Sequence, residues 1–169
     1  VPQKAVMFSG SVLSNITFGK NRHGKPSKER VKAAIRVSQA EEFVSKLDDK
    51  EKAHIAQGGT NVSGGQKQRL SIARTIARDP EIYIFDDSFS ALDYKTDSTL
   101  RSELKKYTKD ATVMIVAQRI GTILNADKIV VLDNGKCVGI GTHKELMKKC
   151  KVYKEIALSQ VSKEELENV

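Results

Sequence analysis

The apolar residues in the first half of the chain recur at helical spacing. Over residues 27–47 they repeat every three or four positions, which predicts two helices with a break near Ser38. A shorter apolar pattern over residues 11–18 predicts one further short helix. Residues 50–61 are polar and contain glycine, so we expect a loop there. The region 9–79 is therefore predicted to be all-helical, with its helices joined by loops.

The pattern then changes to helices that alternate with short apolar strands. The helix that begins at Gly64 is expected to end before Pro80, because proline cannot continue it. Residues 82–85 and 111–117 are predicted to be buried strands, with a helix over 94–107 between them. This order of elements predicts a parallel sheet.

The last part of the chain carries two local signals. Asn134-Gly135 stands between two apolar runs within residues 128–140, which predicts a β-hairpin. Thr142 and Glu145 then form the pattern of a capping box at the start of a final helical region.

These elements predict one α/β domain over residues 1–169. Its parts are the helical region at about 9–79, a sheet region at about 80–160 and a C-terminal tail at 161–169. We expect a parallel sheet flanked by helices, with the hairpin at one edge.

Composition excludes several classes of protein. The content of 39% hydrophobic and 30% charged residues is typical of a globular domain, and no apolar run approaches the roughly 18 residues that a membrane span needs. A net charge of +8 is compatible with a nucleic-acid partner, but the sequence contains no Trp and only 5% of its residues are aromatic. We interpret the charge as solvated helix faces, with no nucleic-acid partner. Cys137 and Cys150 lack metal-like spacing and are expected to be reduced thiols.

The strongest chemical signal is the start of the helix at Gly64. Ser63 is a natural N-cap, and Gln66 completes the capping pattern. A well-capped helix needs nothing more, yet Gly64 and Gly65 each cost about 1 kcal/mol of helix propensity relative to Ala. Close approach of a ligand to bare backbone explains that cost, and a helix N-terminus favours anions. We therefore predict a phosphate-binding site here.

The second signal is a pair of carboxylates. Asp86-Asp87 follows the predicted strand 82–85, at the end where open α/β sheets bind ligands. Mg²⁺ suits this position, because it takes one or two carboxylates together with water and phosphate oxygens. The alternative is a pair of aspartates that cap the following helix.

In combination, these residues resemble ATP-binding cassette (ABC) proteins. Residues 62–69 resemble the signature motif, 82–86 the Walker B strand and 90–93 the D-loop, while Gln3 stands at the position of the Q-loop glutamine. The resemblance covers essentially the whole chain and is nearest to exporters. It implies a P-loop NTPase-type parallel sheet flanked by helices, with an all-helical subdomain that carries the signature motif.

The resemblance also implies roles for the signature residues. Ser63, Gly64 and Gly65 would bind the γ-phosphate of an ATP molecule held mainly by a second nucleotide-binding domain. Gln66 would support this loop.

Further roles follow from the other motifs. Asp86 would help to hold Mg²⁺, mostly through water, and Asp93 would lie across the interface between the two domains. Gln3 would sense Mg²⁺ and the attacking water, and would couple the site to a fused or associated transmembrane domain. The implied location is the cytoplasmic face of a membrane.

One motif of the family does not occur in the sequence. No G-x-x-x-x-G-K-[ST] is present, so the Walker A part of the fold is expected upstream of Val1. We interpret the chain as a C-terminal portion that binds ATP weakly or not at all by itself.

Two further departures concern catalysis. Asp87 stands where the family has a catalytic glutamate, and its carboxylate is shorter by about 1 Å or more, which can cost on the order of 10²-fold in rate. Gln118 stands where the family has the switch histidine, and an amide cannot take up a proton near neutral pH. With an intact signature motif, this combination resembles the slow-site half of a heterodimeric exporter.

Two other function classes remain as alternatives. DNA-repair and chromosome-maintenance ATPases share the signature but insert a long coiled coil, whereas only about sixty residues separate Gln3 from Ser63. A soluble protein with two fused cassettes is disfavoured by the exporter-like context of Gln3 and of Thr142-His143.

Overall fold

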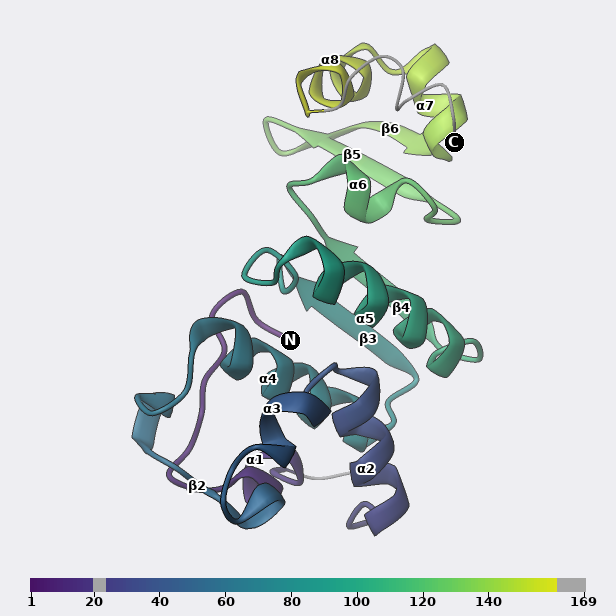
Figure 1. The fold of residues 1–169 in the computed structure, drawn as a ribbon. Helices are drawn as coiled ribbons and strands as arrows, with labels where there is room; N and C mark the ends of the chain where they lie inside the picture. Colours follow the sequence, from purple (N-terminus) through teal and green to yellow (C-terminus); the bar gives the residue numbers. More distant parts are fainter. Residues whose placement is uncertain (20–23, 161–169) are drawn as a thin grey trace. The chain divides into compact units, whose positions relative to one another are not determined.

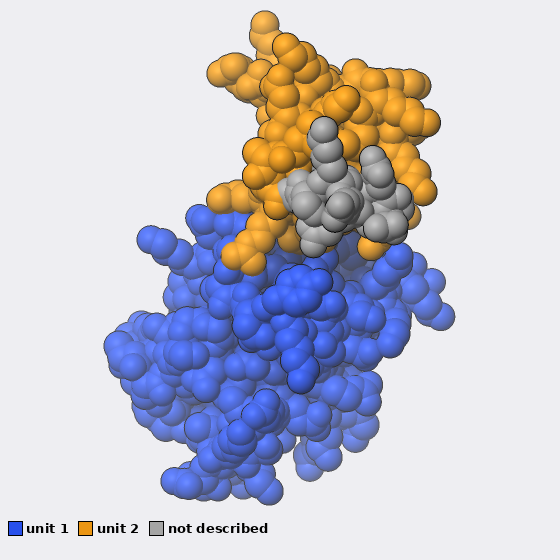
Figure 2. Space-filling model, turned by 45° about the horizontal axis from the view of Figure 1, so that its top comes forward, with its two compact units in different colours: residues 1–116 blue, residues 117–169 orange. Residues whose placement is uncertain are grey.

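The computed structural model describes residues 1–19 and 24–160, so the predicted tail at 161–169 lies outside the described residues. The chain forms two compact units, Val1–Val116 and Ala117–Val169, which Figure 2 shows in different colours. We describe each unit by itself.

The first unit begins with short helices and ends with a strand–helix–strand segment (Figure 1). Its elements are β1 (Gly10–Ser11), α1 (Val12–Ile16), α2 (Lys28–Val37), α3 (Glu41–Ser45), the 3-10 turn η1 (Lys50–Lys52), β2 (His54–Ile55), the 3-10 turn η2 (Gln57–Gly59), α4 (Gly64–Arg78), β3 (Ile82–Asp86), α5 (Tyr94–Tyr107) and β4 (Thr112–Val116).

The predicted helices are confirmed, and their ends have local causes. The Ser27 hydroxyl caps α2 by accepting from Arg30 N, and the break near Ser38 falls where Gln39 adopts a left-handed φ of 58°. The region before the sheet is not wholly helical, however. The strands β1 and β2 pair antiparallel through Gly10↔Ile55 and Ser11↔His54, because the polar loop folds back along the start of α1.

The parallel sheet is also confirmed, in the form of the β3–β4 pair. Its register runs from Ile82↔Thr112 to Asp86↔Val116. The prediction that both strands are buried is wrong for one face. Tyr83 is 1% exposed in the apolar cluster that contains Leu100 of α5, whereas Ile82 on the other face is 56% exposed. Strand residues alternate between faces, and helices of this unit cover only one of them.

The helix α4 forms the centre of the first unit. It packs on α1 and α2 and buries its apolar face completely; the residues with no exposed surface are Leu70, Ile72, Ala73, Ile76 and Ala77.

Arg74 of α4 binds α1 and the segment before it through hydrogen bonds. Its guanidinium donates to Asn15 O (2.8 Å), Asn15 Oδ1 (3.0 Å) and Val6 O (3.0 Å). It also lies over the rings of Phe8 and Phe18, whose centroids are 4.2 Å apart. Burial lowers the pKa of this guanidinium, and the several acceptors compensate its desolvation. These contacts hold the stretch that follows Gln3.

The second unit is a hairpin packed against helices. Its elements are α6 (Ile120–Ile123), β5 (Ile129–Asp133), β6 (Lys136–Gly141), α7 (His143–Lys149) and α8 (Lys151–Gln160). The predicted hairpin turn is confirmed, with φ values of 47° at Asn134 and 75° at Gly135, which are favourable for a tight two-residue turn. The strands β5 and β6 form a two-stranded sheet of their own, so the expected place at an edge of the parallel sheet is not observed.

A buried histidine joins α7 to α8. The predicted capping box at Thr142 is present, and the next residue, His143, turns inward. Its Nδ1 lies 2.8 Å from the hydroxyl of Tyr153, and both side chains are buried. Burial, and then the charge of Lys144, lower the pKa of His143. Burial likewise raises the pKa of Tyr153.

We expect the second unit to lose stability in mild acid. Because the folded-state pKa of His143 lies below the unfolded value, the unfolded state binds the proton more readily. The contribution of His143 to the free energy of unfolding is therefore fully present above a pH of about 6.5, the unfolded pKa of histidine. It is lost as the pH drops through the lower folded-state pKa. Urea denaturation at several pH values measures this. His143→Phe is expected to flatten the dependence, whereas a control change at the exposed His54, to Gln, should leave it unchanged.

Candidate functional site

The start of α4 has the predicted capping geometry. Ser63 Oγ accepts from Gln66 N (3.2 Å), and Gln66 Oε1 accepts from Ser63 N (2.8 Å). The N–H groups of Gly64 and Gly65 lie in the first turn, where a helix offers them no partner of its own. The side chains of Ser63 and Gln66 are thus held by the capping box, and the first-turn N–H groups remain without helical partners, an arrangement that favours anions.

The surroundings of the two glycines differ. A Cβ added at Gly65 would lie 3.4 Å from Ala91 O and 3.9 Å from a methyl group of Leu92, which are ordinary van der Waals distances, so residues 91–92 lie against this turn. A Cβ added at Gly64 would meet no atom within 4 Å. The described fold therefore gives no reason for glycine at Gly64, although glycine weakens a helix.

The carboxylate pair lies at the end of β3, as predicted. Asp86 N donates to Val1 O (2.9 Å), and Asp87 N donates to Val116 O (2.9 Å). Asp87 has a left-handed φ of 45°, which is uncommon for a residue other than glycine. Gln3 Nε2 donates to Asp87 Oδ2 (3.2 Å), so the structure brings these two predicted site residues together.

Two serines to which the sequence assigned no individual role hold this loop. Ser88 is fully buried, and its hydroxyl donates to Val1 O (2.8 Å). The Ser90 hydroxyl donates to Asp87 O (2.9 Å). Their occurrence within three residues after two aspartates was the available signal, because hydroxyls in such positions often bond nearby backbone.

Gln68 was also missed. It is a buried polar side chain on α4, and its Nε2 donates to Pro2 O (3.2 Å). The helix that carries the phosphate-binding turn is thereby joined to the residue before Gln3. Nothing in the local sequence indicates this contact, which spans 66 positions.

Asp93 has a local role in the described structure. Its Oδ1 accepts from Thr96 N (3.0 Å) and caps α5. Hydrogen bonds from Thr96 lower the pKa of this exposed carboxyl, which stays charged at neutral pH. The role across an interface stays a prediction.

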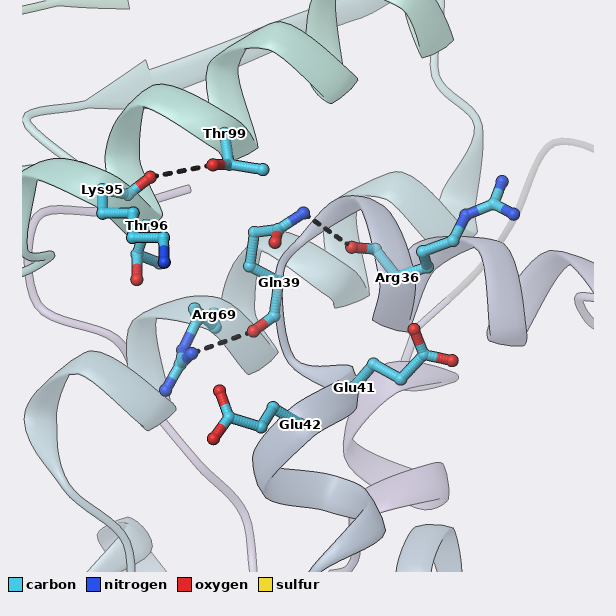
Figure 3. A pocket seen from close by; sticks show the side chains of 8 residues that line it. All are labelled: Arg36, Gln39, Glu41, Glu42, Arg69, Lys95, Thr96 and Thr99. Atoms are coloured by element: carbon cyan, nitrogen blue, oxygen red, sulfur yellow. Dashed lines mark hydrogen bonds between the residues drawn. The ribbon is translucent and has the colours of Figure 1, made fainter.

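A charged groove lies beside α5, shown in Figure 3, and contains none of the predicted site residues. Its lining residues are Arg36, Gln39, Glu41, Glu42, Arg69, Lys95, Thr96 and Thr99. Arg69 Nη1 donates to Gln39 O (2.9 Å), its guanidinium lies 4.9 Å from the ring centroid of Phe43, and its buried Nε has no partner among the described residues.

The described residues contain no group of three or more His, Cys, Asp or Glu side chains that could hold a metal ion by itself. One exposed carboxylate, Asp86, stands at the end of β3. That arrangement fits Mg²⁺, which binds through one or two carboxylates and completes its shell with water and phosphate oxygens.

A family model described as ABC transporter matches residues 1–90 of the chain. The chain belongs to the ABC transporter family. The matched residues include Gln3, the signature motif at Ser63 and the Walker B strand β3. The resemblance predicted from these motifs is thereby confirmed.

Known ABC proteins agree with this assignment over nearly the whole chain. An uncharacterized ABC transporter ATP-binding protein of Mycobacterium tuberculosis is 45% identical over 160 residues, which cover 95% of this chain and 27% of that protein. An ABC multidrug transporter of Trichophyton rubrum is 37% identical over 95% of this chain and 12% of its own length.

The fold of the chain also agrees with the assignment to the ABC transporter family. A solved structure of a bacterial Atm1-family ABC exporter with ATP bound matches 94% of this chain and 27% of that chain, with a TM-score of 0.87 and 32% identity. The P-loop NTPase-type fold is therefore confirmed. The chain spans about a quarter of the length of the M. tuberculosis protein and of this exporter.

Within this ABC domain, Gln118 belongs to the second unit. Its backbone carbonyl accepts from Gln160 Nε2 (2.8 Å) of α8. Its role as a replacement for the switch histidine stays a prediction. No helix among the described residues has both the length and the apolar character that crossing a membrane requires.

Proposed function

We propose that this chain is part of the ATP-hydrolysing engine of an ABC exporter and that its signature motif completes an ATP site on a partner domain. The observation that carries the proposal is Gly64, a glycine in the first turn of α4 that no described packing requires. A phosphate group bound against the backbone at this point gives the residue its reason. The match to an exporter structure with ATP bound supports the same role.

The chain's own site would be slow. Asp87 and Gln118 take the places of a glutamate and a histidine, so one carboxylate is short and one proton acceptor is lost. An intact signature motif beside an altered catalytic pair suits one half of a heterodimer, in which the fast site lies on the partner. A heterodimer would explain why Asp87 and Gln118 depart from the family pattern while the signature motif keeps it.

ATP and Mg²⁺ would meet at Asp86 and Gln3. The metal supplies charge neutralisation for the phosphates when bound, and Asp86 would hold it mostly through water. Gln3 donates to Asp87, which supports a role for its amide in orienting a water beside the phosphate. Attachment to the cytoplasmic face of a membrane would come through a transmembrane domain outside this chain.

The test is an ATPase assay on the full-length protein, purified alone and in complex with its partner subunit. We expect the protein alone to hydrolyse ATP slowly and the complex to be on the order of 10²-fold faster. Fast hydrolysis by a homodimer of the full-length protein would overturn the heterodimer proposal.

A further inference from the structure

One side chain at the end of α8 holds two backbone groups that lie 40 and 42 positions earlier in the chain. Gln160 Oε1 accepts from Ile120 N (2.9 Å), and Gln160 Nε2 donates to Gln118 O (2.8 Å). A primary amide suits this task, because it carries a donor and an acceptor side by side. The two bonded groups stand before and after Arg119, so one amide fixes the backbone on both sides of that residue.

The start of α6 is not capped by its own residues. Arg119 is the N-cap residue of this helix, and its side chain makes no capping hydrogen bond. The first N–H groups of a helix need partners from outside it. Gln160 supplies a partner for the first of them, the N–H of the buried Ile120. The backbone that carries the Gln118 side chain is therefore oriented by α8.

The helix α8 is itself held in place. Tyr153 and Ala157 are buried and lie seven and three positions before Gln160, so the three residues share one face of α8. The Tyr153 hydroxyl lies 2.8 Å from His143 Nδ1, and α8 also packs on α6 and β5. Because this face is anchored before it reaches Gln160, its last residue is a fixed point for the loop.

Stability alone does not account for these two hydrogen bonds. Gln160 and Gln118 are both exposed, so water is at hand to replace the bond between them, which then adds little to the free energy of unfolding. A glutamine side chain also loses rotamer freedom when both ends of its amide are bonded. What the bonds provide is a defined position for the backbone of residues 118–120. Such precision matters where a side chain must meet a reacting group, since a misplacement of about 1 Å can cost on the order of 10²-fold in rate.

We propose that Gln160 is a positioning residue for ATP hydrolysis, which sets the backbone from which the side chain of Gln118 reaches the phosphate. The inference rests on the proposed function, which assigns Gln118 to the chain's own ATP site. Gln160 acts through Gln118 and does not itself touch the nucleotide. The end of α8 thereby takes part in the chemistry.

Hydrogen exchange tests the contact of Gln160 without any catalysis. Exchange of the Ile120 N–H is followed by mass spectrometry in the full-length protein in complex with its partner. Gln160→Leu removes both hydrogen bonds at similar side-chain size and is expected to speed this exchange by about tenfold or more. Lys154→Leu places the same side chain at another exposed position of α8 and should leave the exchange unchanged. Unchanged exchange in Gln160→Leu, or an equal rise in Lys154→Leu, would overturn the inference.

Kinetics at the chain's own site test the positioning. The rate is measured in the full-length complex with Gly64→Asp, whose negative charge keeps phosphate from the signature motif. Gln160→Leu is expected to lower kcat by about tenfold and to leave KM for ATP within about threefold, because the loop moves while binding is retained. Gln160→Glu keeps the side-chain length but loses the donor, so it should lower kcat as well. Thermal unfolding of both variants should match the parent, and a loss of rate that only follows a loss of thermal stability would contradict positioning.

Gln118→Ala separates a failure of this inference from a failure of the proposed function. If Gln160 acts through Gln118, Gln160→Leu should change the rate by less than about twofold once Gln118→Ala is present. A full loss in that background, or a loss in Gln118→Ala alone without one in Gln160→Leu, would sink the positioning role and leave the role of Gln118 intact. An unchanged rate in Gln118→Ala alone would reject the role of Gln118 in the ATP site, and the positioning role with it.

Discussion

Gly64→Asp is expected to lower ATP hydrolysis by the complex of the full-length protein with its partner by about 100-fold or more. The carboxylate would stand at the positive end of α4, where it displaces and repels the phosphate that the backbone donors would bind. Folding should be retained, because an added Cβ at Gly64 meets nothing within 4 Å and an acidic residue suits the first turn of a helix. Hydrolysis and thermal unfolding are measured on the same preparation.

Two comparisons separate the site from a general effect of charge. Gly64→Ala adds only a methyl group and is expected to cause a smaller loss, with a helix that is more stable by up to about 1 kcal/mol. Ser98→Asp adds the same charge at an exposed position of α5 and should leave the rate unchanged. An equal loss in Ser98→Asp would show that the charge, not the place, matters.

Asp87→Glu combined with Gln118→His is expected to speed hydrolysis at the chain's own site by up to about 100-fold. The backbone of Asp87 is held at both sides, by Val116 O through its N–H and by the Ser90 hydroxyl at its carbonyl. The variant keeps both hydrogen bonds, so we expect the added methylene to extend the carboxylate from the same loop. The imidazole that Gln118→His introduces would restore a side chain that can take up a proton.

The gain is measured in the full-length complex whose other site is silenced by Gly64→Asp, so that the remaining hydrolysis belongs to the site of Asp87. Asp133→Glu makes the same change at the end of β5 and serves as the control. No gain over the parent in the silenced complex would contradict the assignment of Asp87 as the shortened catalytic residue.

Local chemistry explains which elements could be predicted from the sequence. The start of α4 could be predicted because the side chains of Ser63 and Gln66 each accept a hydrogen bond from the other's backbone N–H. Its end could be predicted because Pro80 follows Asp79, which has a left-handed conformation. The hairpin was readable because Asn134 and Gly135 tolerate positive φ. In each case the decisive interactions lie within a few residues of one another.

The features that could not be predicted from the sequence depend on contacts between residues that are far apart in the chain. Nothing near Gln68 or Arg74 indicates that these side chains bond the backbone at Pro2 and Val6. The exposed face of the sheet could not be predicted either, because an apolar strand residue such as Ile82 looks the same in sequence whether or not a neighbour covers it. Tertiary structure decides both.

That uncovered face also affects how the isolated chain behaves in solution. Ile82, Ile84, Met114 and Val116 present an apolar surface on adjacent strands, and contiguous patches of this kind promote self-association. A preparation of these residues alone would therefore be sensitive to protein concentration and to detergent. The oligomers it forms would be held together by contacts between these apolar sheet faces.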